Sequence, residues 1–146
     1  MERPSDIIIH ASCVSWHDRA LLILGASGAG KSGLALQLMA YGCKLVADDR
    51  TALSSSPPDL IASCPDPIRD LIEARGVGLL HAETVAQARV AWAVDLDHEE
   101  TERLPHNRKI DLLGHSIPLL HAVKSPHFAA SVLQLLKAGR QEDNPC

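Results

Sequence analysis

The residues with the clearest chemical meaning form a glycine-rich loop in the N-terminal part of this 146-residue chain. Gly25, Gly30, Lys31 and Ser32 satisfy the pattern G-x-x-x-x-G-K-[ST], in which glycines let successive backbone N–H groups turn inward around an anion. The complete loop comprises Gly25, Ala26, Ser27, Gly28, Ala29, Gly30, Lys31 and Ser32. We predict that it binds the phosphates of a nucleoside triphosphate.

Lys31 and Ser32 have separate roles in such a loop. A lysine at this position reaches the β- and γ-phosphates, and the following hydroxyl ligates Mg²⁺. A helix that begins near Lys31 adds the positive end of its dipole. A glycine-rich turn that binds nothing is the alternative, but the continuous apolar run 20–24 before the loop and the helical spacing after it favour nucleotide binding.

Asp48 and Asp49 lie one helix and one strand beyond this loop. If strand, helix and strand form a right-handed parallel unit, both strands end at the same edge of the sheet and the carboxylates face the phosphates. Adjacent strand residues point to opposite faces, so the two can do different work. One would contact the metal or its waters and the other would accept a proton. A polar turn after a strand is the alternative.

The elements that must position these residues are short and alternate between strand and helix. We expect a mixed α/β domain over 1–140, followed by a frayed tail, 141–146. We predict strands at 7–14, 20–24 and 44–47, a turn at 16–19, a helix at 32–41, a loop at 54–59, further elements at 68–80, 88–96 and 117–123, and a closing helix at 126–138 with Ser125 as its cap and Pro126 in its first position.

Composition excludes several classes of function. Apolar residues make up 46% of the chain, and the net charge is −4 without any basic run, which argues against nonspecific nucleic-acid binding. The four cysteines lack C-x-x-C spacing, so reduced thiols are expected and not a zinc site. The apolar stretch 7–9 is too short for a signal peptide or a membrane span, so we expect a cytoplasmic protein.

Several segments, taken in order over residues 6 to 138, resemble the catalytic domain of the HPr kinase/phosphorylase family. They are His10 in its apolar strand, the phosphate loop, the segment LVADDR at 45–50, the segment IEARGVGLL at 72–80, Arg103-Leu104, and LGHSIP at 113–118. The resemblance implies a P-loop kinase domain of the HPr kinase type, PEP carboxykinase-like, with a mixed sheet and flanking helices.

The resemblance also implies an activity and roles for particular residues. The family phosphorylates a serine of the phosphocarrier HPr with ATP and Mg²⁺ and also removes that phosphate, which regulates carbon and nitrogen use through a phosphotransferase system. Asp48 would be the general base, with Asp49 and His10 close by. Glu73 would join Ser32 at Mg²⁺, and Arg103 would serve dephosphorylation.

The sequence departs from the family pattern at four places. The separate N-terminal domain of longer members is absent from this sequence, Ala11 stands where the family has glycine, 125–127 replaces the family's "GRN", and the region 99–109 is short. These changes bear on homo-oligomeric, hexameric assembly and on phosphorylase activity more than on the ATP site.

Two other functions remain open at this stage. One is a small-metabolite or nucleotide kinase, although those enzymes typically carry arginine-rich lid segments and none is evident. The other is a nucleotide-sensing protein that binds without turnover. A GTPase is disfavoured because the sequence has no N-K-x-D segment, and 107–111 misses that spacing.

Overall fold

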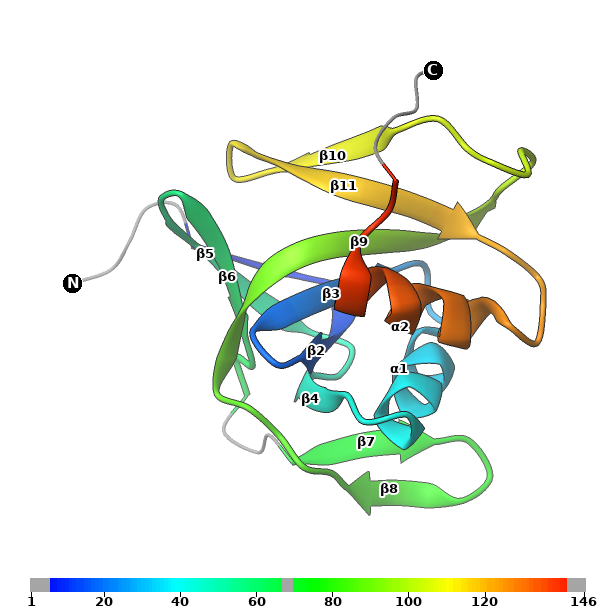
Figure 1. The fold of residues 1–146 in the computed structure, drawn as a ribbon. Helices are drawn as coiled ribbons and strands as arrows, with labels where there is room; N and C mark the ends of the chain where they lie inside the picture. The colour runs from blue at the N-terminus through cyan, green and yellow to red at the C-terminus, as the bar shows by residue number, and fades with distance from the viewer. Residues whose placement is uncertain (1–5, 67–69, 142–146) are drawn as a thin grey trace.

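The computed structural model of the chain describes residues 6–66 and 70–141. Within these residues, a nine-stranded mixed sheet carries two helices, and a two-stranded hairpin lies apart from it (Figure 1). The elements are β1 (Ile7–Ile9), β2 (Ala11–Trp16), β3 (Arg19–Leu24), α1 (Lys31–Ala40), β4 (Lys44–Ala47), β5 (Thr51–Ser56), β6 (Asp59–Ser63), β7 (Leu71–Ala74), β8 (Gly78–His81), β9 (Gln87–Glu99), β10 (Arg108–Leu112), β11 (His115–Ala122) and α2 (Phe128–Ala138).

The order of the strands brings the ends of β3 and β4 to one edge of the sheet. The main path is β1-β5-β6-β9-β3-β2-β4, and β2 is antiparallel to both β3 and β4. Cys13 of β2 therefore faces Leu22 on one side and Ala47 on the other. The predicted common direction of the two strands is confirmed, but β2 lies between them, so they are not neighbours as a simple parallel unit would have them.

The long strand β9 connects the two halves of the sheet. It runs parallel to β3 along most of its length, pairs with β6 through its first residues, and pairs with β11 further along. The residues beyond Asp95, which pairs with Leu24, therefore lie beside the start of the loop that follows β3. Figure 1 shows β9 as the curved band that crosses the whole sheet.

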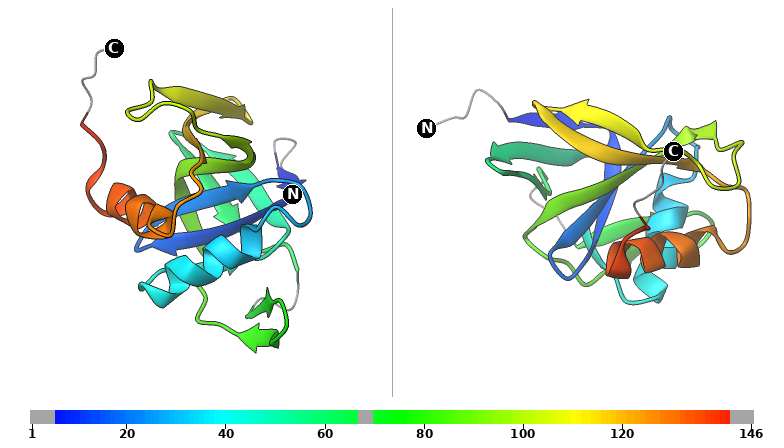
Figure 2. Two further views of the ribbon diagram at one scale, coloured as in Figure 1. Left: turned by 90° about the vertical axis from the view of Figure 1, so that its right-hand side faces the viewer. Right: turned by 45° about the horizontal axis from the view of Figure 1, so that its top comes forward.

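Both helices cover the same face of the sheet and touch one another (Figure 2). Leu38 of α1 and Leu136 of α2 are almost fully buried there with Leu21 and Ile23 of β3. A second cluster, which includes Leu22, fills the opposite face between strands. Because β3 is buried on both faces, the continuous apolar run predicted as a covered strand is confirmed.

The structure differs from the sequence prediction most clearly at 54–59. This segment, predicted as a loop from its Ser and Pro content, belongs to the β5–β6 hairpin, and only Pro57 and Pro58 form the turn between the strands. Leu53 and Leu60 are buried, and pairing of β5 with β1 and β6 satisfies the backbone. Packing of alternate side chains thus overrides the local turn preference of serine.

Smaller differences concern the ends of other elements. The predicted strand 7–14 is interrupted by a bend at His10, and strand β10 was not predicted. Of the element predicted at 68–80, residues 68 and 69 lie outside the described residues, and the β7–β8 hairpin occupies 71–81. Helix α2 begins at Phe128 with His127 as its N-cap residue, so the predictions of Ser125 as the cap and Pro126 as the first helical residue are wrong. Ser125 instead forms a turn before the helix, in which its Oγ accepts the N–H of His127 at 3.0 Å. The predicted tail lies outside the described residues except for Gln141.

A nearly buried ion pair closes the connection between β9 and β10. Arg108 donates from its Nη2 to one Glu100 oxygen at 2.9 Å and from its Nε to the other at 3.1 Å. The Glu100 side chain is 6% exposed. The hydrogen bonds from Arg108 lower the pKa of Glu100 to about 2. Among the described residues, the helices are too short or too polar to cross a membrane.

Replacing Glu100 with Gln should reduce the free energy of unfolding at neutral pH. It should also make that free energy fall less steeply as the pH is lowered. The pKa of Glu100 falls from 4.5 to about 2 on folding, so the pair stabilises the fold above the unfolded pKa, and this stabilisation is lost as the pH falls through the folded pKa. The stability difference between wild type and Glu100→Gln, measured by urea unfolding, should therefore shrink between about pH 5 and about pH 2.

Glu99→Gln is the matched control. The Glu99 side chain is 57% exposed and lies 3.8 Å from Lys124, and exposed pairs contribute little. A Glu100→Gln difference that stays constant with pH, or that equals the effect of Glu99→Gln, would contradict the role given to Glu100.

Candidate active site

The phosphate loop connects β3 to α1 in a conformation that requires glycine. Gly25, Gly28 and Gly30 have φ values of 152°, 86° and 102°, a region that other residues rarely adopt. A Cβ atom at Gly25 would also lie 3.0 Å from the Cβ of Ala29. Helix α1 begins at Lys31 directly after the left-handed Gly30, so the free N–H groups of its first turn belong to the loop.

A cleft of about 470 Å³ opens over this loop. It brings together residues from the loop, from the turn after β4 and from the β7–β8 hairpin. Its lining comprises Ser27, Gly28, Gly30, Lys31, Ser32, Gly33, Leu36, Asp48, Asp49, Glu73, Ala74 and Arg75. The carboxylates predicted to face the phosphate loop therefore do so, and Arg75 joins them as a cation that we had not singled out.

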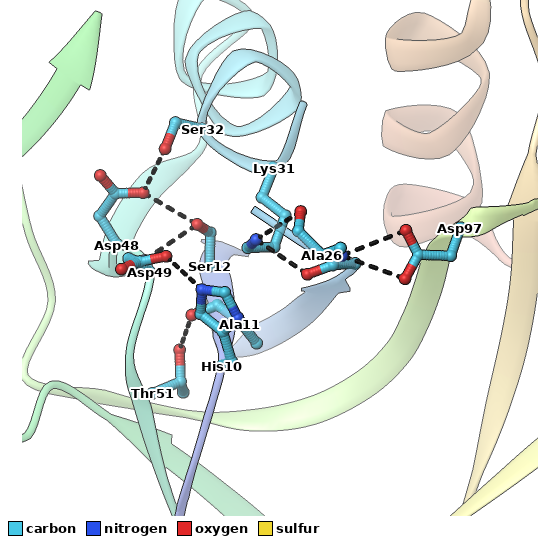
Figure 3. A network of polar contacts seen from close by, with 11 residues as sticks. His10, Ala11, Ser12, Ala26, Lys31, Ser32, Asp48, Asp49, Thr51 and Asp97 are labelled. Atoms are coloured by element: carbon cyan, nitrogen blue, oxygen red, sulfur yellow. Dashed lines mark hydrogen bonds and ion pairs between the residues drawn. The ribbon is translucent and has the colours of Figure 1, made fainter. Parts of the chain in front are cut away.

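Lys31 is folded back onto its own loop. Its side chain donates from Nζ to the carbonyl oxygens of Gly25 at 2.9 Å and Ala26 at 3.1 Å, and the residue is only 6% exposed. On the other side, the Ala26 N–H donates to both carboxylate oxygens of Asp97 at 3.0 and 3.1 Å. The Gly25–Ala26 peptide group is thus held from both ends, its C=O by Lys31 and its N–H by Asp97 (Figure 3).

Asp97 was missed by sequence reasoning. It lies in β9 just beyond the apolar segment predicted at 88–96, and β9 is the parallel neighbour of β3. Carboxyl ends of parallel neighbours meet at one edge of a sheet. An acidic residue at the end of that apolar segment was the available signal, but only the pairing of β9 with β3 shows that it reaches the phosphate loop.

The Asp48 carboxylate is the meeting point of three segments of the chain. Its Oδ1 accepts hydrogen bonds from the hydroxyls of Ser32 at 2.7 Å and Ser12 at 2.8 Å. Its Oδ2 accepts a longer one, 3.3 Å, from the Glu73 N–H. Asp48 therefore touches the phosphate loop directly. Ser12, like Arg75 and Asp97, was not singled out by the sequence analysis.

Asp49 faces a different partner. Its backbone is left-handed, with φ of 69°, and its Oδ1 lies 2.7 Å from Nε2 of His10. Both side chains are substantially exposed, 63% for Asp49 and 47% for His10. The two aspartates contact different partners, and the cause is the sharp turn after β4, because both residues lie beyond the strand end at Ala47 and strand alternation does not apply to them.

Glu73 and Arg103 lie in different places. Glu73, in β7, is exposed and lines the cleft. Arg103 lines another cavity of about 270 Å³, between the 100–105 segment, the end of β11 and α2. The structure therefore gathers His10, Asp48, Asp49 and Glu73 near the phosphate loop and leaves Arg103 outside that cleft.

Comparison with known proteins assigns the chain to a family. The model of the HPr Serine kinase C-terminal domain matches residues 4–121. The chain belongs to this family. The resemblance on which the sequence analysis relied is therefore confirmed, including its mixed α/β fold.

Curated relatives extend the comparison across the chain. The HPr kinase/phosphorylase of Stenotrophomonas maltophilia K279a is 40% identical over 76 residues, 51% of this chain and 24% of that protein. The same-named protein of Caldicellulosiruptor bescii is 35% identical over 124 residues, covering 76% and 40%. That of Aromatoleum aromaticum is 32% identical over 151 residues, covering 94% and 48%. The chain thus spans at most about half the length of these HPr kinase/phosphorylases.

A solved structure supports the fold independently. The Hpr(Ser) kinase/phosphatase from Coxiella burnetii superposes with a TM-score of 0.75 at 24% identity, covering 90% of this chain and 88% of that one. The HPr kinase fold of the chain therefore extends beyond the family match, through most of the described residues.

Replacing Asp97 with Ala should speed solvent exchange of the Ala26 amide severalfold, because that N–H loses its acceptor. Asp97→Asn keeps an acceptor oxygen and should keep most of the protection. The Ala29 N–H, which donates to the Ala26 carbonyl at 3.0 Å, serves as the internal control. Hydrogen exchange followed by NMR measures both amides, and equal Ala26 rates in wild type and Asp97→Ala would contradict the contact.

Proposed function

We propose that this chain is an ATP- and Mg²⁺-dependent protein-serine kinase that acts on an HPr-like phosphocarrier protein and, in the reverse direction, as a phosphorylase. One observation carries the proposal: the Asp48 carboxylate lies within hydrogen-bonding distance of the phosphate-loop Ser32, 2.7 Å, and lines the same cleft. Membership of the HPr kinase family and the names of its curated relatives support the choice of acceptor.

In the proposed kinase reaction, the γ-phosphate of ATP lies over the loop. Lys31 exchanges its two carbonyl partners for β- and γ-phosphate oxygens, which neutralises negative charge where it develops. The serine oxygen of the acceptor attacks the γ-phosphorus, the bond to the β-phosphate oxygen breaks, and Asp48 takes the hydroxyl proton. The products are ADP and a phosphoserine.

In the proposed phosphorylase direction, an oxygen of inorganic phosphate attacks the phosphoserine phosphorus. Asp48 accepts the proton of that phosphate and returns a proton to the leaving serine oxygen, so that serine and pyrophosphate are released. Asp49 and His10 stand beside this carboxylate as a hydrogen-bonded pair. Arg103 can assist dephosphorylation only if the 99–107 segment moves or a second copy of the chain supplies the arginine.

The residues present fit a magnesium ion. Mg²⁺ prefers hard oxygen ligands and in kinases is bound through one or two carboxylates together with substrate phosphates. Ser32, Asp48 and Glu73 supply oxygen donors around one cleft. Ser32 and Glu73 would hold the ion, which when bound would neutralise phosphate charge, while Asp48 remains the proton acceptor.

The proposal has wider consequences. We assign residues 1–140 to one PEP carboxykinase-like catalytic domain with 141–146 as a tail, and we place the protein in the cytoplasm. A homo-oligomer is compatible with this assignment, and neither nucleic acid nor a membrane is part of it. Regulation of carbon or nitrogen use through a phosphotransferase system is the role that follows from an HPr-like substrate.

Asp48→Asn should keep near-normal ATP affinity but lose phosphotransfer by about 10²- to 10⁴-fold, because general-base help is lost. Lys31→Ala should lose ATP affinity as well, because a cation is removed from the phosphates. Calorimetry of ATP binding and the time course of phosphorylated acceptor separate the two effects. Near-wild-type transfer in Asp48→Asn, with loss in Asp49→Asn, would assign the proton transfer to the other aspartate.

The same assay separates the alternative functions. Phosphate transferred to a nucleotide or sugar but never to an HPr-like protein would indicate a metabolite kinase. ATP binding without transfer to any acceptor would indicate a nucleotide sensor.

Glu73→Gln should raise the Mg²⁺ concentration needed for half-maximal phosphotransfer, because a neutral amide ligates this hard cation poorly. Thermal unfolding should change little, since Glu73 is exposed. Glu99→Gln, another exposed glutamate but outside the cleft lining, is the control. A Mg²⁺ titration of Glu73→Gln that superposes on wild type would remove Glu73 from the metal site.

A further inference from the structure

Ser12 is a fully buried hydroxyl at the base of the active-site cleft, with 0% exposure. It belongs to the central strand β2, where its main chain pairs with Ile23 of β3. Its Oγ donates to Asp48 Oδ1 at 2.8 Å and accepts the Asp49 N–H at 3.1 Å (Figure 3). One buried hydroxyl therefore contacts the side chain of one aspartate and the main chain of the next.

Ser12 and Ser32 donate to the same oxygen of Asp48, but they differ in what else they can bind. Ser32 stands in the first turn of α1 and lines the cleft, where a metal or a phosphate would draw its hydroxyl away. Ser12 lies inside the sheet, does not line the cleft, and has no competing ligand. Once Ser32 turns toward the cleft, Ser12 is the hydroxyl that still holds Asp48 Oδ1.

We propose that Ser12 is a positioning residue for phosphotransfer: its hydroxyl keeps the Asp48 carboxylate aimed into the cleft while Ser32 is engaged by the bound nucleotide. This rests on the proposed function and adds a residue to it. A carboxylate anchored from below through Oδ1 presents Oδ2, which accepts the long hydrogen bond from the Glu73 N–H at 3.3 Å, to the acceptor hydroxyl. Without Ser12 it would rotate, and the proton acceptor would be misplaced even though the nucleotide remained bound.

The turn that carries Asp48 and Asp49 has other anchors, so loss of the hydroxyl should not unfold it. The Ala11 N–H donates to the Asp49 carbonyl at 3.1 Å, and the Thr51 hydroxyl donates to the Ala11 carbonyl at 2.8 Å. Ser12→Ala should therefore fold. The same strand supplies a matched control, because Ser15 is also buried, 2% exposed, and its Oγ has no hydrogen-bond partner among the residues that the structure describes.

The experiment compares wild type with Ser12→Ala, Ser12→Thr and Ser15→Ala, using Mg·ATP and an HPr-like protein as acceptor. Ser12→Ala should lower kcat about tenfold, in keeping with loss of a hydrogen bond to a charged group, with the KM for ATP unchanged within about twofold. Ser12→Thr retains the hydroxyl and should restore most of kcat, and Ser15→Ala should behave as wild type. Thermal unfolding checks that each variant is folded.

A second readout does not depend on activity. The Asp49 amide should exchange with solvent faster in Ser12→Ala than in wild type or Ser15→Ala, because it loses its acceptor. An unchanged exchange rate, or equal kcat values for Ser12→Ala and Ser15→Ala in an active protein, overturns the role of Ser12. A rise of about tenfold in the KM for ATP in Ser12→Ala, without loss of kcat, also overturns the role of Ser12.

Failure of the proposed function gives a different pattern. If wild type transfers phosphate to no acceptor, the kinase proposal falls together with the catalytic role of Ser12. Amide exchange then shows whether Ser12 nevertheless holds the Asp49 main chain, which is a purely structural contact.

Discussion

The rest of the site depends on the hydrogen bonds that the Asp48 carboxylate accepts. It joins β2 through Ser12, the start of α1 through Ser32, and the β7–β8 hairpin through the Glu73 N–H. These segments are distant in sequence, and the carboxylate satisfies a buried hydroxyl and a loop hydroxyl at once. A charged acceptor of this kind binds its donors more strongly than a neutral one. The cleft therefore has a shape before any ligand enters, and the proton acceptor proposed for catalysis is also its structural centre.

The phosphate loop is held by a second pair of contacts at a single peptide group. Lys31 binds the Gly25 carbonyl and Asp97 binds the Ala26 N–H, so the peptide cannot flip without breaking both. This arrangement exists because β9 is long enough to run past the end of β3. The same strand then carries the chain into the Glu100–Arg108 pair. One strand thus leads from the Asp97 contact with the phosphate loop to the Glu100–Arg108 pair before β10.

Membership of the HPr kinase family explains the arrangement of the cleft better than it explains the remainder of the chain. The family match ends at residue 121, before α2, which nevertheless packs against α1 and closes the core. Arg103 sits in the cavity beside α2, away from the phosphate loop. The proposed binding of ATP would therefore need only residues gathered in one cleft. Handling of a protein substrate would involve surfaces outside that cleft.

The phosphate loop, the strand before it, the helix after it and the strand that ends at Asp48 could all be predicted from sequence, because each depends on nearby residues: glycines that adopt positive φ, a continuous apolar run, helical spacing. The 54–59 strands could not, because serine and proline favour turns until partner strands satisfy the backbone. Only the tertiary structure decided that β2 lies between β3 and β4 and that β9 lies beside β3. Those pairings bring Ser12 to Asp48 and Asp97 to Ala26. Contacts between residues so far apart in sequence depend on strand order, which no local pattern encodes.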